Sequence, residues 1–245
     1  MNSDKMTDDE VAIHSALIQW FEYDAILFYN LSKPDCNYAI FEYWLRFYNV
    51  MRNTPKDTRE VLFKELKSHI KKFKSATGED KDFLFVKQLA SKCKELNITR
   101  GRILSLVSKF ACACNPKVFM PIDSINQKGL VEIIKKEGWK DSYKGTENDY
   151  IKFMKLVTKY KHSRYQEIKN FYEQYEYSYK IPINNLNTSY YEITSGEKEI
   201  STFYKMPEEI FLLRFIDKRW MAEGSLEKIT AEIQLKKERV RNING

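Results

Sequence analysis

The sequence predicts a mostly α-helical protein, and three observations carry this prediction. A helix-capping pattern, Thr7-x-x-Glu10, precedes an apolar stretch at 11–29. Apolar residues in this stretch and in later ones recur every three or four positions, which is the spacing of one helix face. Breaks such as Pro34 and the Asn-Pro pair at 115–116 separate successive stretches.

Each expected helix begins or ends for a local reason. The turn at 53–55 closes the second helix, Asp57-x-x-Glu60 caps the third, and Pro207 starts the last one. Residues 178–206 are rich in Tyr, Asn, Ile and Thr and are expected to form a small β-hairpin or a loop. The expected helices cover 11–29, 38–51, 57–73, 81–96, 102–114, 124–138 and 147–177, with a last one from 207 and an exposed basic helix over 228–241.

The composition fits a globular protein. Of the 245 residues, 43% are hydrophobic and 31% are charged. We expect a single compact domain over 1–245, made of two packed helical subdomains. No apolar run reaches the roughly 18 residues of a membrane span, and the N-terminus lacks the basic and apolar regions of a signal peptide. The expected protein is therefore a cytoplasmic monomer with no membrane partner.

Basic residues gather in one part of the chain. The formal net charge of +7 is a mild indication of a polyanionic partner. Between 92 and 117 there are six basic residues and one acid, Glu95. This segment either contacts a polyanion or forms a solvated helix face. The six basic residues are Lys92, Lys94, Arg100, Arg102, Lys109 and Lys117.

The four cysteines do not predict a metal site. Cys112 and Cys114 are two positions apart within an apolar run, which is too close for a CxxC zinc site. The three histidines are far apart in the sequence. We expect free thiols packed as small hydrophobic groups, and neither a metal nor another cofactor.

A tight turn at 97–101 joins the helices expected over 81–96 and 102–114. Gly101 is expected to have a positive φ, which glycine adopts without a steric penalty. Such a turn exposes backbone N–H groups at the start of the next helix, and these groups bind phosphate without reading sequence. An ordinary αα-hairpin is the alternative. The expected phosphate contacts are Thr99, Arg100, Gly101 and Arg102.

The second of these helices is followed by a loop with the pattern apolar-Pro-apolar-Asp, which ends at Asp123. A helix, a glycine-containing hairpin, a second helix and such a loop together resemble the central element of the helix-hairpin-helix DNA glycosylase superfamily, which has endonuclease III, adenine-mismatch and 8-oxoguanine branches. The similarity covers about 83–130 and leaves 131–245 as a C-terminal helical part. The similar parts are 83–96, 97–101, 102–114 and Phe119-Met120-Pro121-Ile122-Asp123, and Leu213-Arg214-x-x-Asp217-x-x-Trp220 is similar to the closing helix of some bacterial members.

The resemblance implies that Asp123 is the catalytic acid of a DNA glycosylase. Breaking an N-glycosidic bond builds positive charge on the deoxyribose, and a carboxylate beside it stabilises that state and orients or deprotonates water. Without the resemblance, Asp123 is expected to be the N-cap of the next helix, a role compatible with catalysis. Bifunctional members have a Schiff-base lysine where this chain has Leu106. Lys109, three residues later, is the second catalytic candidate, and a monofunctional enzyme that uses water is expected.

A DNA glycosylase also extracts its target base from the duplex and reads it in a pocket. Aromatic and polar residues of the first two helices are candidates for this pocket, and packing in the core is the alternative for each. Asn53 and Thr54 are the candidate wedge that fills the vacated stack. The pocket candidates are Trp20, Tyr23, Asp24 and Trp44.

The sequence therefore predicts a hydrolase that flips a modified, damaged or mismatched base out of double-stranded DNA and leaves an abasic site. Base excision repair and defence against phages with modified bases both fit this activity. Two other classes stay open. One is a non-catalytic nucleic-acid-binding helical module that uses the basic hairpin, and the other is an α-helical interaction protein whose partner surface is the Tyr-rich stretch 172–204.

Overall fold

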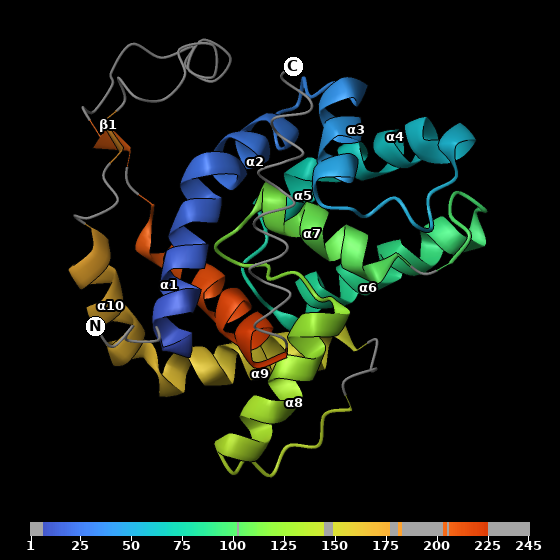
Figure 1. Cartoon of the computed structure of the whole chain (residues 1–245). Coiled ribbons are helices and arrows are strands. Elements are labelled where there is room, and N and C mark those ends of the chain that lie inside the picture. The colour runs from blue at the N-terminus through green and yellow to red at the C-terminus, as the bar shows by residue number, and fades with distance from the viewer. Residues whose placement is uncertain are drawn as a thin grey trace.

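Helices dominate the structure, which confirms the predicted fold class at the level of a mostly α-helical protein. The computed structural model in Figure 1 describes residues 7–101, 103–144, 149–176, 181–182, 203–204 and 206–224. The helices are α1 (Asp8–Gln19), a π-helix (Trp20–Asp24), α2 (Ala25–Leu31), α3 (Tyr38–Phe47), a 3₁₀-helix (Lys56–Thr58), α4 (Arg59–Ser68), α5 (Ile70–Lys74), α6 (Asp80–Glu95), α7 (Leu104–Cys114), α8 (Ser124–Lys136), α9 (Tyr150–Ser163), α10 (Tyr165–Glu176) and one over 208–224, named the 208–224 helix.

The N-terminal helix begins with the predicted capping box. The Thr7 side chain accepts a hydrogen bond from the Glu10 N–H, and the Glu10 carboxylate accepts one from the Thr7 N–H. The helix then widens into the π-helix, which ends at Asp24, before α2 continues to Leu31. The expected single helix is thus present with a widened turn in its middle.

Two helices that the sequence predicts as continuous are broken. The expected helix over 57–73 consists of the 3₁₀-helix, α4 and α5, with a break at His69, whose N–H bonds to the carbonyl three residues back. The expected helix over 147–177 divides into α9 and α10 at Arg164. The Arg164 side chain pairs with Asp9 of α1. This contact joins segments far apart in the sequence, so the local pattern does not reveal it.

The central helix of the fold is α7. It packs against α2, α5 and α6, and it lies in the middle of the molecule in Figure 1. Every residue of α7 except Ser105 and Lys109 is buried. A helix surrounded in this way is apolar on nearly all faces rather than along one stripe, which explains the apolar run that includes Cys112 and Cys114.

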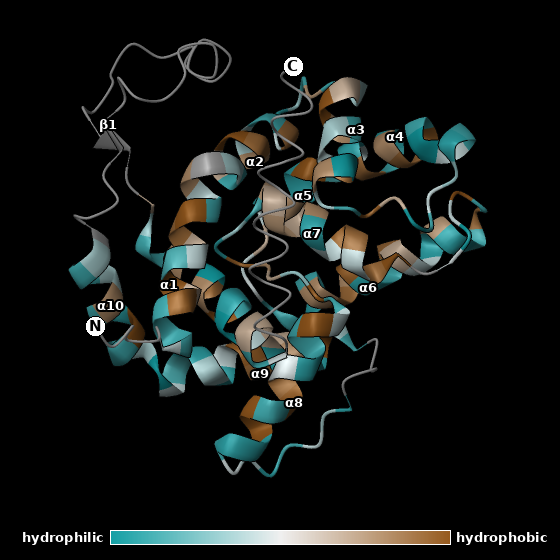
Figure 2. Ribbon diagram, in the orientation of Figure 1, coloured by the Kyte–Doolittle hydropathy of each residue, from teal (hydrophilic) through white to brown (hydrophobic). Residues whose placement is uncertain are grey.

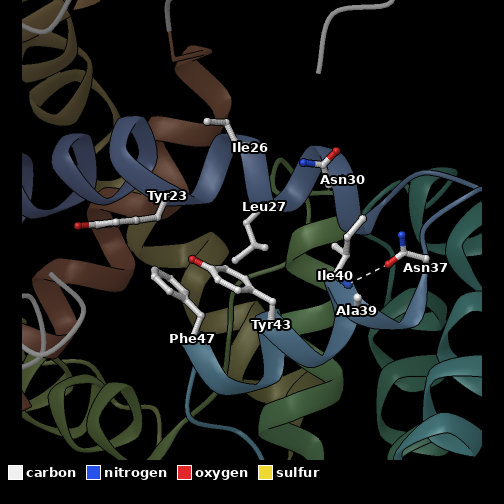
Figure 3. Close-up of a pocket in the computed structure, with 9 residues that line it drawn as sticks. All are labelled: Tyr23, Ile26, Leu27, Asn30, Asn37, Ala39, Ile40, Tyr43 and Phe47. Atoms are coloured by element: carbon white, nitrogen blue, oxygen red, sulfur yellow. Dashed lines mark hydrogen bonds between the residues drawn. The ribbon is translucent and has the colours of Figure 1, made fainter. Parts of the chain in front are cut away.

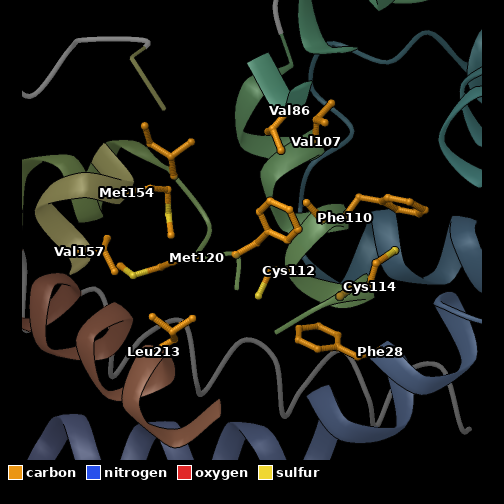
Figure 4. Packing of buried hydrophobic residues seen from close by; sticks show 14 of the residues in the cluster. Phe28, Val86, Val107, Phe110, Cys112, Cys114, Met120, Met154, Val157 and Leu213 are labelled. Atoms are coloured by element: carbon orange, nitrogen blue, oxygen red, sulfur yellow. The ribbon is translucent and has the colours of Figure 1, made fainter. Parts of the chain in front are cut away.

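The apolar core continues from α1 to the 208–224 helix. Figure 4 shows Cys112 of α7 facing Met120, with Met154 of α9 and Leu213 of the 208–224 helix above and below Met120, and Phe110 of α7 pointing away from it. In Figure 2, most helices carry both hydrophobic and hydrophilic positions, as expected for helices with one buried face. Residues far apart in the sequence therefore share one core.

All four cysteines are buried and carry free thiols, as predicted. Burial raises the pKa of the Cys36 and Cys93 thiols to about 11. Burial also raises the pKa of Cys112 and Cys114 well above the usual range. Since the thiolate is the nucleophilic form, these cysteines act as small packing groups.

A two-residue antiparallel ladder joins β1 (Ile181–Pro182) to β2 (Phe203–Tyr204). It forms near the two ends of the stretch in which the sequence predicts a small β-hairpin or a loop. The residues between the two strands, and the expected basic helix over 228–241, lie outside the described residues. Among the helices described, none combines the length and the apolar character that crossing a lipid bilayer requires.

Candidate functional site

A cleft of about 380 Å³ lies where α7 and α8 begin. Its walls come from the segment after α3, from the first turns of α7, and from the start of α8 with the residue before it. Ser105 and Lys109, the two α7 residues that are not buried, both line it. The polar lining also includes Asn49, Arg52, Asn53, Asp123 and Gln127.

Asp123 is the N-cap of α8 and also faces this cleft. Its Oδ1 accepts hydrogen bonds from the N–H groups of Ile125 and Asn126, both at 3.0 Å. Its Oδ2 lies 3.6 Å from Lys109 Nζ, and the two side chains are 22% and 17% exposed. One carboxylate oxygen therefore caps the helix, and the other lies beside a cation in a solvent-accessible cleft.

The loop before Asp123 is fastened by three neighbouring helices. Ser108 Oγ of α7 accepts the Ile122 N–H at 3.1 Å. The hydroxyl of Tyr150 on α9 donates to the Met120 carbonyl at 2.8 Å. The side-chain amide of Asn126 on α8 donates to the Pro121 carbonyl at 3.2 Å. With these bonds and the helix cap, the position of the Asp123 carboxylate is set before any ligand arrives.

The first turn of α7 adds positive charge to the cleft. Its N-cap residue, Ile103, makes no side-chain capping hydrogen bond, so the first N–H groups and the helix dipole keep their partial positive charge. Arg52 and Lys109 add two full charges. Among the described residues that line the cleft, Asp123 is the only acid. The site is thus one carboxylate surrounded by positive groups.

The turn between α6 and α7 differs from the prediction in its backbone. Asn97, and not Gly101, has the positive φ, of 55°. The N–H groups of Asn97 and Ile98 bond to the carbonyls of Lys94 and Cys93, both at 3.0 Å, which closes α6 with a Schellman motif. This motif requires the left-handed conformation at the residue after the cap, and asparagine tolerates it. The expectation for Gly101 was therefore wrong.

The predicted phosphate contacts are only partly available in this turn. The N–H of Thr99 bonds to the Cys93 carbonyl at 3.3 Å, and that of Arg100 to the Asn53 carbonyl at 3.1 Å. Thr99 is 4% exposed, and its hydroxyl donates to the Gly101 carbonyl at 2.8 Å. The Arg100 side chain is exposed. The fourth predicted contact, Arg102, lies outside the described residues.

The two predicted wedge residues lie in different surroundings. Asn53 is exposed, lines the cleft, and is tied to the turn by the Arg100 N–H. Thr54 is 3% exposed, and its hydroxyl donates to the Met51 carbonyl at 2.8 Å. The structure therefore brings Asn53 to the cleft and leaves Thr54 in the interior.

The predicted base-pocket residues do not line the cleft of Asp123. Trp20, Asp24 and Trp44 are buried, with exposures of 3%, 0% and 0%. Trp44 packs edge-on against Phe110 of α7, with ring centroids 5.8 Å apart. The fourth candidate, Tyr23, lines a separate cleft of about 330 Å³ between α2 and α3, shown in Figure 3. In this arrangement the aromatic candidates serve the core or the second cleft.

Asp24 belongs to a buried group of charged side chains. Arg214 of the 208–224 helix pairs with Asp24 and also lies 3.5 Å from Asp217, which Lys218 approaches to 3.3 Å. Burial by itself would raise the pKa of Asp217, but Lys218 and Arg214 hold it below its usual value. Asn126 donates to Asp217 at 2.6 Å. Two carboxylates and two cations are balanced here, and Asn126 connects them to the first turn of α8.

Five polar residues of the cleft were missed as candidates at the sequence level: Asn49, Arg52, Ser105, Ser124 and Gln127. Asn49 and Arg52 follow α3, and nothing in their local pattern marks them. Gln127 lies four residues after Asp123, so the helical period places both on one face of α8. That spacing was the available signal for Gln127.

In the described part of the chain, no three His, Cys, Asp or Glu side chains are close enough to hold a metal ion. Known protein families, curated proteins and solved structures were compared with this chain, and none of them matches it. Inference about its activity therefore depends on the geometry of the cleft.

Proposed function

We propose that this protein is a DNA N-glycosylase, a hydrolase that cleaves the bond between deoxyribose and a flipped base, with Asp123 as its catalytic carboxylate. The supporting observation is the placement of Asp123. Two backbone N–H groups hold one of its oxygens, and the other lies beside Lys109 in a cleft of about 380 Å³. Small-molecule sites have volumes of roughly 300–1,000 Å³. The cleft lies within this range, so it can hold one extruded base.

The chemistry needs a negative group that does not have to reorganise. The C1′–N bond breaks with its electron pair leaving on the base, and the sugar becomes cationic. A carboxylate held in place stabilises that cation and accepts a proton from the water that adds to C1′. The helix cap on Oδ1 and the Lys109 ammonium beside Oδ2 give the Asp123 carboxylate one orientation.

Water is the proposed nucleophile rather than lysine. A lysine amine attacks only in its neutral form, which requires a lowered pKa or a nearby base to take its proton. Lys109 is paired with the carboxylate that the reaction itself uses. Its role in this proposal is to orient Asp123, and the enzyme is monofunctional.

The positive groups around the cleft support double-stranded DNA as the partner. Arg52 and Lys109 line the cleft, and Arg100 is exposed on the turn whose backbone bonds to Asn53 at the cleft edge. Basic side chains that neutralise phosphates release counterions, and this supplies most of the sequence-independent affinity for DNA. The Arg100 side chain and the first turn of α7 are the proposed phosphate contacts.

Base release from defined duplexes tests the proposal. Duplexes that each contain one uracil, hypoxanthine, 8-oxoguanine or 5-hydroxymethylcytosine are incubated with the full chain and then heated in alkali, which cleaves abasic sites. Mass spectrometry identifies any free base. We expect release of at least one base, with strand cleavage only after alkali.

Each other result has a defined meaning. Strand cleavage without alkali would show a lyase and overturn the monofunctional assignment. Retention of DNA without release of any base would show a binding module and refute the proposed hydrolysis. Failure to retain DNA even at low salt would favour a helical interaction protein.

A further inference from the structure

Gln127 is a side chain of the cleft that the proposed hydrolysis leaves without a role. It lies one turn after Asp123 on α8, and its N–H bonds to the Asp123 carbonyl at 3.0 Å. Its side chain lines the cleft and is only 9% exposed. A polar side chain that is this strongly buried destabilises the fold unless its hydrogen-bonding groups have partners.

The hydroxyl of Tyr143 holds the Gln127 amide. It donates to Gln127 Oε1 at 3.0 Å, and Tyr143 is itself 7% exposed. Among the described residues, this hydroxyl is the hydrogen-bond partner of the Gln127 side chain. Because the bond engages the carbonyl end of the amide, the nitrogen with its two N–H donors is the end left for a ligand.

The other polar groups of the cleft also favour a ligand that accepts hydrogen bonds. Arg52 and Lys109 are donors only. Asp123 is the acidic acceptor among the described lining residues. In the proposed reaction its carboxylate stabilises the cationic sugar, so it does not serve as a hydrogen-bond acceptor for the base. The neutral polar side chains of the lining both donate and accept, so donors outnumber acceptors around an entering base. Gln127 is the donor that lies one turn after the catalytic carboxylate on α8.

We propose that Gln127 reads the extruded base by donating a hydrogen bond from Nε2 to a carbonyl oxygen on the base edge that faces α8. This inference rests on the proposed function and adds a substrate class to it. Bases with a carbonyl on that edge, such as hypoxanthine and uracil, are preferred over their amino counterparts, adenine and cytosine. Tyr143 is a positioning residue that keeps the amide in its donating orientation.

The preference follows from the cost of an unpaired donor. An amino group on the base would face the Gln127 N–H groups, so two donors would meet and a buried one would lose its partner. Such a mismatch reduces kcat/KM by about 10- to 100-fold.

The experiment measures kcat/KM for base release on four duplexes that are identical except at one position, which carries hypoxanthine, adenine, uracil or cytosine. The unmodified full chain is expected to prefer hypoxanthine over adenine and uracil over cytosine. Gln127→Leu removes the donor and abolishes both preferences. Gln127→Glu replaces the donor with an acceptor and reverses them. Gln88→Leu, at an exposed position of α6, is the matched control and leaves both ratios unchanged.

Tyr143→Phe tests the positioning role. It removes only the hydroxyl, so the amide can rotate, and the preferences are expected to weaken with KM rising more than kcat falls. A purely structural role would lower the rates on all four duplexes by one factor and leave their ratios constant. Thermal unfolding is recorded for every variant. Gln127→Glu, which keeps the shape of the side chain, decides the matter if Gln127→Leu does not fold.

The failures of the two proposals can be distinguished. If the unmodified protein releases bases and Gln127→Leu retains the same ratios, the role of Gln127 is overturned and the glycosylase assignment stands. If none of the four bases is released but 5-hydroxymethylcytosine, which carries the amino group of cytosine, is, the substrate class is overturned by itself. If only 8-oxoguanine is released, which shares the 6-carbonyl of hypoxanthine, an unchanged kcat/KM for it in Gln127→Leu overturns the role of Gln127. If no duplex of either set loses a base, both proposals are overturned.

Discussion

Replacing Asp123 by asparagine separates the two roles of this residue. Asparagine caps helices about as well as aspartate does. Its Oδ1 is therefore expected to accept the same two backbone N–H bonds, which measure 3.0 Å with Asp123. The negative charge 3.6 Å from Lys109 Nζ disappears. The variant is therefore expected to fold like the parent and to lack the group that stabilises the cationic sugar.

The two expected effects differ greatly in size. A partly exposed ion pair contributes about 0–1 kcal/mol to stability, so Asp123→Asn is expected to lower the free energy of unfolding by no more than about 1 kcal/mol. Asp123→Ala also removes the cap, which costs about 1 kcal/mol more. Loss of a fixed group that stabilises transition-state charge lowers the rate by roughly 100- to 1,000-fold.

The assay is single-turnover base release followed by alkali, with urea unfolding of the same preparations. The matched control is Asp149→Asn, since Asp149 caps α9 by accepting the Lys152 N–H at 3.2 Å and is not among the residues that line the cleft. This control is expected to keep the parental rate. If Asp123→Asn keeps it too, Asp123 is a helix cap without a catalytic role, and the reasoning from its geometry is refuted.

Three other substitutions test the DNA contact, the packing of α8 and the buried charges. Arg100→Ala is expected to weaken binding to every duplex and to reduce the slope of log affinity against log salt by about 1, as fluorescence anisotropy measures; an unchanged slope would remove Arg100 from the interface. Gly129→Ala would place a Cβ 1.7 Å from the Trp220 carbonyl oxygen and is expected to lower the Tm strongly. The control Gly101→Ala, whose Cβ would have its nearest contact at 3.6 Å, is expected to leave the Tm unchanged. Equal Tm values for the two variants would contradict the packing of α8 against the 208–224 helix. Asp217→Asn leaves a buried cation unpaired and is expected to cost about 3–5 kcal/mol at neutral pH. Because the pKa of Asp217 is lowered on folding, its stabilisation is present above the unfolded value of about 3.9 and is lost as the pH falls through the folded value. Urea unfolding should therefore show the difference from the parent shrinking only below about pH 4, and a difference that shrinks between pH 7 and 5 would contradict this.

The sequence predicts helix ends well where the signal is a side chain next to the end. The capping box at Thr7 and the cap at Asp123 form as expected, because each needs only residues within three positions. The predicted cap at Asp57 was wrong, because Asp57 lies in the 3₁₀-helix and the N-cap of α4 is Thr58, which makes no side-chain capping hydrogen bond. The breaks at His69 and Arg164 were not predicted. The helix breaks at Arg164, whose side chain pairs with Asp9 of α1. The spacing of apolar residues does not reveal a contact with such a distant segment.

The turn before α7 shows how two local signals can compete. A glycine in a turn favours a positive φ at that glycine, which pointed to Gly101. The chain instead closes α6 with a Schellman motif at Asn97. Once that motif has reversed the chain, Gly101 needs no left-handed conformation.

The sequence identified Asp123 and Lys109 as candidates, but the distance between them depends on how α7 packs beside the start of α8. The packing of α3 against α7 buries Trp44 in the core, although helical spacing permits either role. Tyr143 reaches Gln127 from the segment after α8, which lies outside any helix.

The sequence by itself determined the helical class, most helix ends and the residue that caps α8, because caps, breaks and apolar spacing act over a few residues. Only the tertiary structure decided which polar side chains share a cleft and which are buried. Those outcomes depend on contacts between distant segments, such as the pairing of Arg214 with Asp24 and of Asn126 with Asp217. A local pattern specifies which face of a helix is apolar, whereas the packing of all helices together decides what that face meets.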